Sequence, residues 1–211
     1  MLRRLLALAV VPLIAFGTIA LTGCEDGGVA PAQLTPTEAA TPTGAPEPTA
    51  LPTFQGGRQP VEGMIAFRTG MPSPGTLINV RSASHDEGFD RIVFEFTGAP
   101  PDYRVEYIPQ ATSCTTGEPV SVIGPSHLQV RFNLAQAHTD EGVSTINRTD
   151  QVLDLPSMLN ATQTCDFEGV VTWVVGLIQE LDFAVTTLED PLRLVVDVAH
   201  PSVPPTPIAG F

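Results

Sequence analysis

Arginine and carboxylate side chains alternate with apolar residues in two segments that lie far apart in the chain. Arg91 stands in the first segment, and Arg193 and Asp197 stand on one face of an expected strand in the second. A guanidinium group holds a carboxylate with two parallel hydrogen bonds, so these residues can bind a carboxylate-bearing ligand. They can also pair with charges on neighbouring strands. We therefore leave two interpretations open, a structural ion pair and a ligand-binding role.

Two further polar clusters, at residues 85–90 and 138–141, combine histidine with carboxylates. Such groups can hold a cation or assist proton transfer. Both clusters lie in Gly- or Ser-containing segments, where solvated charge is the usual explanation. The sequence has no motif for a zinc protease, a nucleophilic hydrolase or a phosphate loop. We predict no metal site, no cofactor and no enzymatic activity, and a hydrolase is the weakest alternative.

The charge of the chain excludes one class of partner. Its 211 residues include 23 Asp and Glu against 10 Arg and no Lys, which gives a formal net charge of −13. A protein that binds nucleic acid needs a basic surface to neutralise phosphates. We therefore predict that nucleic acid is not a partner.

Residues 1–23 have the layout of a secretory signal peptide, because Arg3 and Arg4 precede an apolar stretch from Leu5 to Leu21. The sequence Leu-Thr-Gly-Cys that ends at Cys24 resembles the lipobox of bacterial lipoproteins. In that family the cysteine is acylated and becomes the first residue of the mature chain. The resemblance implies a lipid anchor at Cys24, with palmitate among its acyl chains, on the extracytoplasmic face of the cell membrane. An uncleaved transmembrane anchor is the alternative, since about 17 apolar residues approach a spanning length.

Residues 24–60 are rich in Pro, Thr, Ala and Gly, and Thr-Pro-Thr occurs twice in them. This composition offers too little apolar surface to offset the entropy of ordering, so we predict a disordered linker. A second Pro-rich segment, residues 201–211, closes the sequence. The folded domain is predicted between the two, at residues 61–200, with its core at about 75–199.

Short segments of alternating apolar and polar residues predict that this domain consists of strands. The clearest segments are residues 92–96, 103–107, 128–134, 170–175 and 192–198. Gly and Pro turns separate them, which favours an all-β fold of the β-sandwich type. A short helix within residues 150–160 is the one helical element that the pattern allows. Tyr103, Tyr107 and Trp173 can stack on sugar rings, but their strand positions favour core packing.

Cys114 and Cys165 remain once Cys24 is assigned to the lipid. They form an even pair in an exported protein, where a disulfide is the default state. Closing a loop of about 50 residues contributes roughly 4 kcal/mol in the chain-entropy model. We predict the disulfide, with two buried thiols as the alternative.

Three segments together resemble the AMIN-like domain of bacterial envelope lipoproteins. They are residues 88–96 (Gly-Phe-Asp-Arg-Ile-Val-Phe-Glu-Phe), 166–173 (Asp-Phe-Glu-Gly-Val-Val-Thr-Trp) and 190–197 (Asp-Pro-Leu-Arg-Leu-Val-Val-Asp). The resemblance covers residues of about 75–199 and implies a β-sandwich. The last segment also resembles the final strand of the broader AMIN domains, which are targeting modules found beside cell-wall amidases and pilus secretins and are thought to bind peptidoglycan.

The resemblance implies an exported, lipid-anchored envelope protein with a non-catalytic binding domain, whose partner is peptidoglycan or an envelope protein. Peptidoglycan stems carry carboxylates, which would suit Arg91 and Arg193. An edge strand of the sandwich is a second means of binding, because it can accept a strand of a partner. A carrier of small apolar ligands is the alternative from another class, and it needs an apolar pocket between the sheets. The bulky Phe94, Phe132 and Trp173 favour a filled interior instead.

Overall fold

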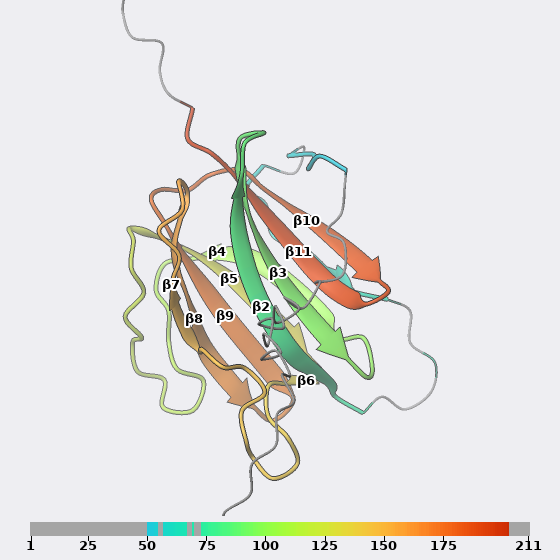
Figure 1. The fold of residues 1–211 in the computed structure, drawn as a ribbon. Helices are drawn as coiled ribbons and strands as arrows, with labels where there is room; N and C mark the ends of the chain where they lie inside the picture. The colour runs from blue at the N-terminus through green and yellow to red at the C-terminus, as the bar shows by residue number, and fades with distance from the viewer. Residues whose placement is uncertain (1–49, 55–56, 67–68, 70–72, 203–211) are drawn as a thin grey trace, which may run out of the picture. The chain divides into compact units, whose positions relative to one another are not determined.

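The computed structural model describes residues 50–54, 57–66, 69 and 73–202, and every regular element among them is a β-strand (Figure 1). The strands are β1 (Val61–Met64), β2 (Gly75–His85), β3 (Phe89–Thr97), β4 (Asp102–Ile108), β5 (Ser126–Asn133), β6 (Ala135–Gln136), β7 (Asp150–Val152), β8 (Met158–Phe167), β9 (Val170–Leu177), β10 (Phe183–Glu189) and β11 (Leu192–Ala199). Within this described part of the chain, no helix has the length and apolar character needed to cross a membrane.

The predicted signal peptide and lipid anchor lie outside the described residues. The same holds for most of the predicted linker and for residues 203–211 of the predicted tail.

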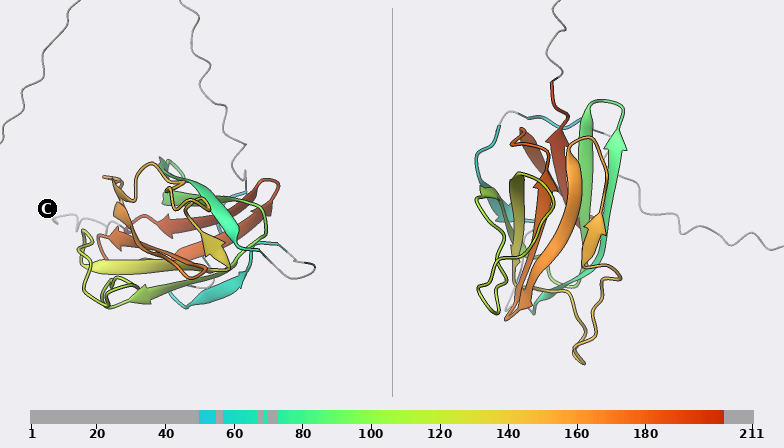
Figure 2. Two further views of the ribbon diagram at one scale, coloured as in Figure 1. Left: turned by 90° about the horizontal axis from the view of Figure 1, so that it is seen from below. Right: turned by 90° about the vertical axis from the view of Figure 1, so that its left-hand side faces the viewer.

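The strands form two sheets that face each other as the layers of a sandwich (Figure 1, Figure 2). The six-stranded sheet has the order β1-β4-β5-β9-β8-β7, and the five-stranded sheet has the order β10-β11-β3-β2-β6. Neighbouring strands are antiparallel, apart from β2 and β6, which pair in parallel at Gly75 and Thr76. The predicted all-β fold of the sandwich type is confirmed.

The period-two alternation of the sequence explains how each sheet buries one face. In β5, Leu128, Val130 and Phe132 are fully buried, whereas Arg131 between them is exposed. Strand β9 is buried on both faces over most of its length, as its β-branched run predicts. Each of the five strand segments predicted from the sequence lies within an observed strand, apart from the last residue of 128–134.

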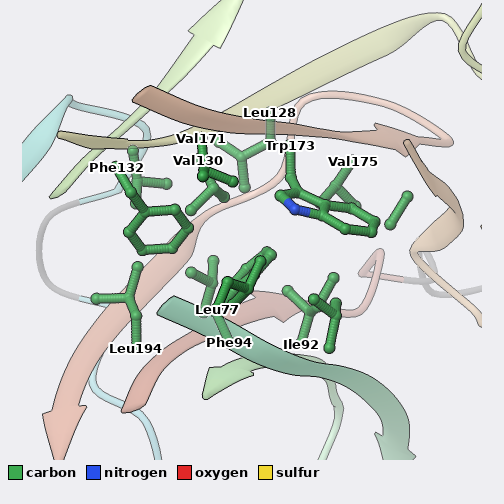
Figure 3. Close-up of a cluster of buried hydrophobic side chains, with 14 of the residues drawn as sticks. Leu77, Ile92, Phe94, Leu128, Val130, Phe132, Val171, Trp173, Val175 and Leu194 are labelled. Carbon is green, nitrogen blue, oxygen red and sulfur yellow. The ribbon is translucent and has the colours of Figure 1, made fainter. Parts of the chain in front are cut away.

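Aromatic side chains from both sheets meet in the centre of the core (Figure 3). Phe94 on β3 packs edge-to-face against Phe132 on β5 and Trp173 on β9, with ring centroids 5.3 and 6.1 Å apart. All three side chains are fully buried. They fill the space between the sheets that a carrier of small apolar ligands would need.

The segment between β4 and β5, residues 109–125, is fixed to the outer face of β8 and β9. Cys114 in this segment forms a disulfide with Cys165 on β8, which confirms the predicted pairing. Farther along, a side chain at Gly176 on β9 would collide with the carbonyl oxygen of Ile123, so only glycine allows this close approach. The segment therefore covers one end of the outer face of the six-stranded sheet.

The predicted helix within residues 150–160 is wrong. Asp150–Val152 forms β7, and the chain then turns back into β8, which pairs with it. The backbone N–H groups of Ser157 and Met158 donate to Oδ2 of Asp90 at 2.6 and 3.0 Å. A buried carboxylate on β3 thus satisfies donors that a helix would satisfy internally, and no local pattern reveals such a distant partner.

We expect the disulfide to contribute about 4 kcal/mol to the free energy of unfolding, because it closes a loop across a sequence separation of 51 residues. The double variant Cys114→Ala/Cys165→Ala should lose this amount in urea denaturation. Adding reductant to the wild type should produce the same loss and should leave the variant unchanged. A stability equal to that of the oxidised wild type would contradict the expectation.

Candidate ligand-binding face

Arg91 and Asp197, two of the residues predicted from the sequence, bind each other across the five-stranded sheet. They are direct partners in the register of β3 and β11, and Arg91 Nε and Nη2 donate to the two carboxylate oxygens of Asp197 at 2.6 and 2.9 Å. Their side chains are only 3% and 1% exposed. The pair therefore joins the two strands, which is the structural role that the sequence left open.

Arg193 lies on the same face of β11 but does not share this contact. It stands four residues before Asp197, which is about 13 Å along a strand. Its Nε donates to the carbonyl oxygen of Pro191 at 3.3 Å, and its side chain is buried. The three residues thus share one face of one sheet without meeting at one point, and their ligand-binding role stays a prediction.

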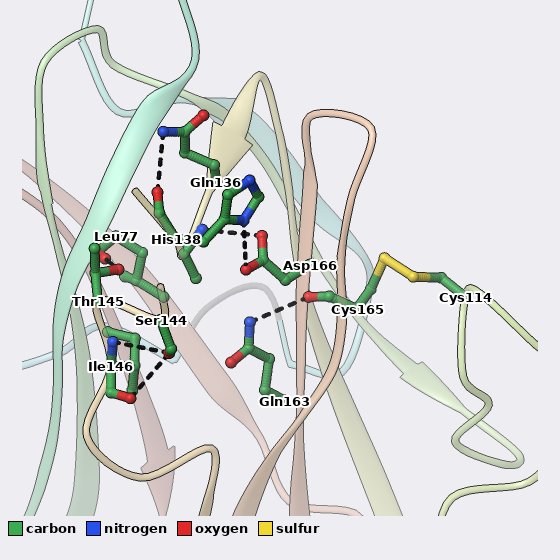
Figure 4. A network of polar contacts seen from close by, with 11 residues as sticks. Leu77, Cys114, Gln136, His138, Ser144, Thr145, Ile146, Gln163, Cys165 and Asp166 are labelled. Carbon is green, nitrogen blue, oxygen red and sulfur yellow. Dashed lines mark hydrogen bonds and ion pairs between the residues drawn. A yellow bond between two sulfur atoms is a disulfide. The ribbon is translucent and has the colours of Figure 1, made fainter. Parts of the chain in front are cut away.

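One residue from each histidine–carboxylate cluster joins a distant segment, Asp90 from the first and His138 from the second. In the first, the fully buried Asp90 places Oδ1 2.8 Å from Nε2 of His200, just after β11. In the second, Nδ1 of His138 lies 2.8 Å from Oδ2 of Asp166, which fixes the segment after β6 against β8 (Figure 4). Across residues 50–54, 57–66, 69 and 73–202, no group of three or more His, Cys, Asp or Glu side chains is placed to hold a metal ion.

The outer face of the six-stranded sheet carries two rows of side chains that cross five strands in register. The first row runs from β1 through β4, β5 and β9 to β8, and the second lies two residues away on each strand. Residues directly opposite each other, and residues two apart, point to the same side of a sheet. The ten side chains therefore share one surface, which we call the two-row face. Its rows are Glu62, Arg104, Arg131, Thr172 and Cys165, and Met64, Asp102, Asn133, Val170 and Phe167.

Two shallow hollows open on the two-row face, one on each side of Arg131 and Asn133. The first has a volume of about 450 Å³ and lies at β1 and β4, beside Tyr103. The second has a volume of about 230 Å³ and lies at β9 and β8, beside the disulfide. Exposed apolar side chains stand at the two ends, Met64 with 44% and Phe167 with 51% exposure. The two-row face therefore combines two hollows, polar groups between them and apolar side chains at its ends.

Arg104 on this face is held by two carboxylates. Its Nη1 donates to Glu62 at 2.7 Å, and its Nε and Nη2 donate to Glu106 at 2.8 and 2.9 Å. The hydrogen bonds to Glu106, and then to Glu62, raise the pKa of Arg104, and the guanidinium in turn lowers the pKa of Glu106. Arg104 is therefore a charge that the protein itself already balances.

Arg131 differs from Arg104, although the two are direct partners in the register of β4 and β5. It is exposed, and its Nε donates to Oδ1 of Asn133 at 3.3 Å. None of the ion pairs formed among the described residues includes Arg131. A carboxylate from a ligand would complete the hydrogen bonding of this guanidinium.

The three aromatic residues considered for sugar stacking all pack in or against the core. Trp173 is fully buried, and the partly buried Tyr107 donates its hydroxyl to the carbonyl oxygen of Leu181 at 2.6 Å. Tyr103 is also partly buried, packs against the core beside Phe132, its partner in register, and places its ring over Gly63. Burial raises the pKa of both tyrosines. The prediction of core packing is confirmed for all three, because Trp173 is part of the core and both tyrosines pack against it.

A family model, the AMIN-like domain, matches residues 75–200, from the start of β2 to the residue after β11. The chain belongs to the AMIN-like domain family. No curated protein and no solved structure matches it. The matched part of this AMIN-like domain supplies β4, β5, β8 and β9 of the two-row face, and β1 adds a fifth strand from the segment before it.

Reasoning from the sequence did not find the two-row face of the AMIN-like domain. Alternation places Arg131 on the solvent face of its strand, and Phe167 stands out as a large apolar residue beside the turn at Glu168 and Gly169. Both signals are visible in the sequence. Only the strand order β1-β4-β5-β9-β8 shows that they belong to one surface.

Proposed function

We propose that this chain is a non-catalytic binding module of the bacterial cell envelope, and that its two-row face binds peptidoglycan. AMIN-like domains are in general peptidoglycan-targeting modules without catalytic activity. The observation that carries the choice of face is Arg131. Its guanidinium is exposed in the first row, fixed by Asn133, and has no ion-pair partner among the described residues.

The chemistry of the face fits a polymer that carries both sugars and carboxylates. Arg131 would hold a stem-peptide carboxylate with two hydrogen bonds. Asn133 beside it is partly exposed and bears an amide that can bond to hydroxyl and amide groups of the ligand, whereas Thr172 is buried. Five strands, spaced by about 4.8 Å, make the face roughly 19 Å wide, which suits an extended ligand better than a small one.

The charge of the domain limits how this ligand is attracted. Residues 61–200 contain seven arginines against nineteen acidic residues. An acidic domain does not attract an anionic polymer over a long range. Affinity must therefore come from short-range contacts, which makes the hydrogen bonds of Arg131 decisive.

The other candidate functions have less support. A carrier of small apolar ligands would need the interior that Phe94, Phe132 and Trp173 fill. A hydrolase would need carboxylates that converge on a substrate. The two carboxylates that converge on the two-row face, Glu62 and Glu106, are instead both paired with Arg104. An envelope protein remains the alternative occupant of the face.

We further propose that the domain is held at the extracytoplasmic face of the cell membrane by a lipid on Cys24. The support is the lipobox resemblance and the signal-peptide layout of residues 1–23. Two acyl chains give a stable attachment, since each buried methylene contributes about 0.8 kcal/mol. The Pro- and Thr-rich residues that follow would then act as a spacer between membrane and wall.

Cys24→Ala is expected to remove the full chain from the membrane fraction of an expressing bacterium, because the acylated thiol is lost. Mass spectrometry of the wild type should find a mature N-terminus at Cys24 that carries acyl chains. A variant that stays in the membrane fraction, together with a wild type that keeps residues 1–23, would instead support the transmembrane alternative.

Arg131→Ala is expected to weaken binding of the full chain to insoluble peptidoglycan by at least about tenfold, since a charged hydrogen bond contributes about 1.5–3 kcal/mol. Co-sedimentation over a range of peptidoglycan concentrations measures the affinity. The affinity of Arg131→Lys should lie between that of the wild type and that of Arg131→Ala, because lysine keeps the charge but loses the two-bond geometry.

Arg148→Ala is the matched control, because Arg148 is also exposed and lies outside the two-row face. It should bind as the wild type does. An equal loss in both variants would show a nonspecific charge effect. Absence of saturable binding by the wild type would contradict the peptidoglycan proposal and would favour a protein partner.

A further inference from the structure

Strand β10 forms one edge of the five-stranded sheet and pairs only with β11 (Figure 1). At its start, the backbone N–H of Phe183 donates to the carbonyl oxygen of Gly57 at 3.1 Å, which is away from β11. The preceding carbonyl, that of Asp182, points the opposite way and accepts from the N–H of Ala199 at 2.9 Å. The start of β10 thus shows which backbone groups face the open side.

Backbone groups in an antiparallel strand alternate between its two neighbours. Since Phe183 faces outward, Val185, Thr187 and Glu189 direct their N–H and C=O groups to the open edge as well. Within the described part of the chain, Gly57 is the one residue whose backbone bonds to this edge. The edge beyond Phe183 therefore presents a row of backbone donors and acceptors that another strand can use.

The charges around this edge are arranged at its ends. Residues 184–188, Ala-Val-Thr-Thr-Leu, are uncharged, and three of them are β-branched. Exposed acidic residues stand before the strand, at Glu180 and Asp182, and at its far end, at Glu189 and Asp190. Of these, Asp182 pairs with Arg58 at 3.3 Å. The open edge is thus an uncharged strand with acidic groups at both ends.

This arrangement disfavours a second copy of the chain as the occupant. An antiparallel pair that uses the whole edge would be centred on Thr186 and would place Asp190 of one copy opposite Asp182 of the other, twice. Like charges directly opposite each other destabilise a strand pair. A strand with basic residues at its ends would meet acidic groups at both ends instead.

We infer that the β10 edge binds an extended segment of another protein, in which an uncharged, β-branched stretch is flanked on both sides by lysine or arginine. The main-chain hydrogen bonds hold the segment, and the flanking charges select it. This site lies in the five-stranded sheet and is independent of the two-row face, which belongs to the six-stranded sheet.

The test uses fluorescent synthetic peptides of alternating valine and threonine, about six residues long, with the full chain as receptor. One peptide carries a lysine at each end and the other a glutamate at each end. Fluorescence anisotropy should show saturable binding of the lysine peptide and at least about tenfold weaker binding of the glutamate peptide. Absence of binding by the lysine peptide, or equal binding of the two, would overturn the inference.

Two variants separate edge pairing from general charge attraction. Glu180→Lys/Glu189→Lys, at two exposed positions, should abolish the preference for the lysine peptide, because each end of the edge then carries one basic and one acidic residue. Thr187→Pro should abolish binding, because it removes an outward N–H while leaving the bonds to β11. Circular dichroism checks that the proline variant is folded. If it is not folded, the peptide preference of Glu180→Lys/Glu189→Lys alone tests the inference. An unchanged preference in the charge-reversed variant would overturn the inference.

Arg131→Ala should leave peptide binding unchanged, since it alters the other sheet. A loss of peptide binding in this variant would place the peptide on the two-row face and would also overturn the assignment to β10. The peptidoglycan proposal and the β10-edge inference can therefore be contradicted independently of each other.

Discussion

The contact of the two sheets through Phe94, Phe132 and Trp173 is the constraint on which the rest of the structure depends. Side chains alternate along a strand, so filling the interior from both sheets also fixes which residues point outward. A shift of one residue in β5 would expose Phe132 and bury Arg131. The surface that we propose for binding is thus specified by the packing of the core, although none of its charged groups takes part in that packing.

The two outer faces use arginine in different ways. On the five-stranded sheet, Arg91 and Asp197 complete each other and hold β3 to β11. On the six-stranded sheet, Arg104 is paired with Glu62 and Glu106. Arg131 donates to the side-chain amide of Asn133 and forms no ion pair with the described residues. The disulfide at Cys165 closes one side of this second face and ties the segment above it to the sheet. The two binding modes that we propose, side-chain contacts on this face and strand pairing at the β10 edge, would therefore place two different kinds of partner on opposite sheets.

The sequence predicted the local features of the fold and missed those that depend on strand order. Alternation located β3, β4, β5, β9 and β11, and the even pair of cysteines located the disulfide. The helix within residues 150–160 was wrong because Asp90, about 67 residues earlier in the chain, supplies the hydrogen bonds of that turn. Arg91 and Asp197 were singled out as residues able to pair with charges on neighbouring strands, and their two hydrogen bonds show that they pair with each other. Arg131 could not be singled out, because the role that we propose for it depends on four other strands that no local pattern places beside it.

The most direct test of the central claim is to map soluble peptidoglycan fragments on the isotope-labelled full chain by nuclear magnetic resonance. The account predicts that shifts concentrate at Arg104, Arg131, Asn133 and Thr172 and saturate together, and that Arg131→Ala needs at least about tenfold more ligand to reach the same shifts. Amides around Arg91, Arg193 and Asp197 on the opposite sheet should stay unchanged. Shifts that concentrate on the five-stranded sheet, or that saturate at the same ligand concentration in Arg131→Ala as in the wild type, would contradict the account.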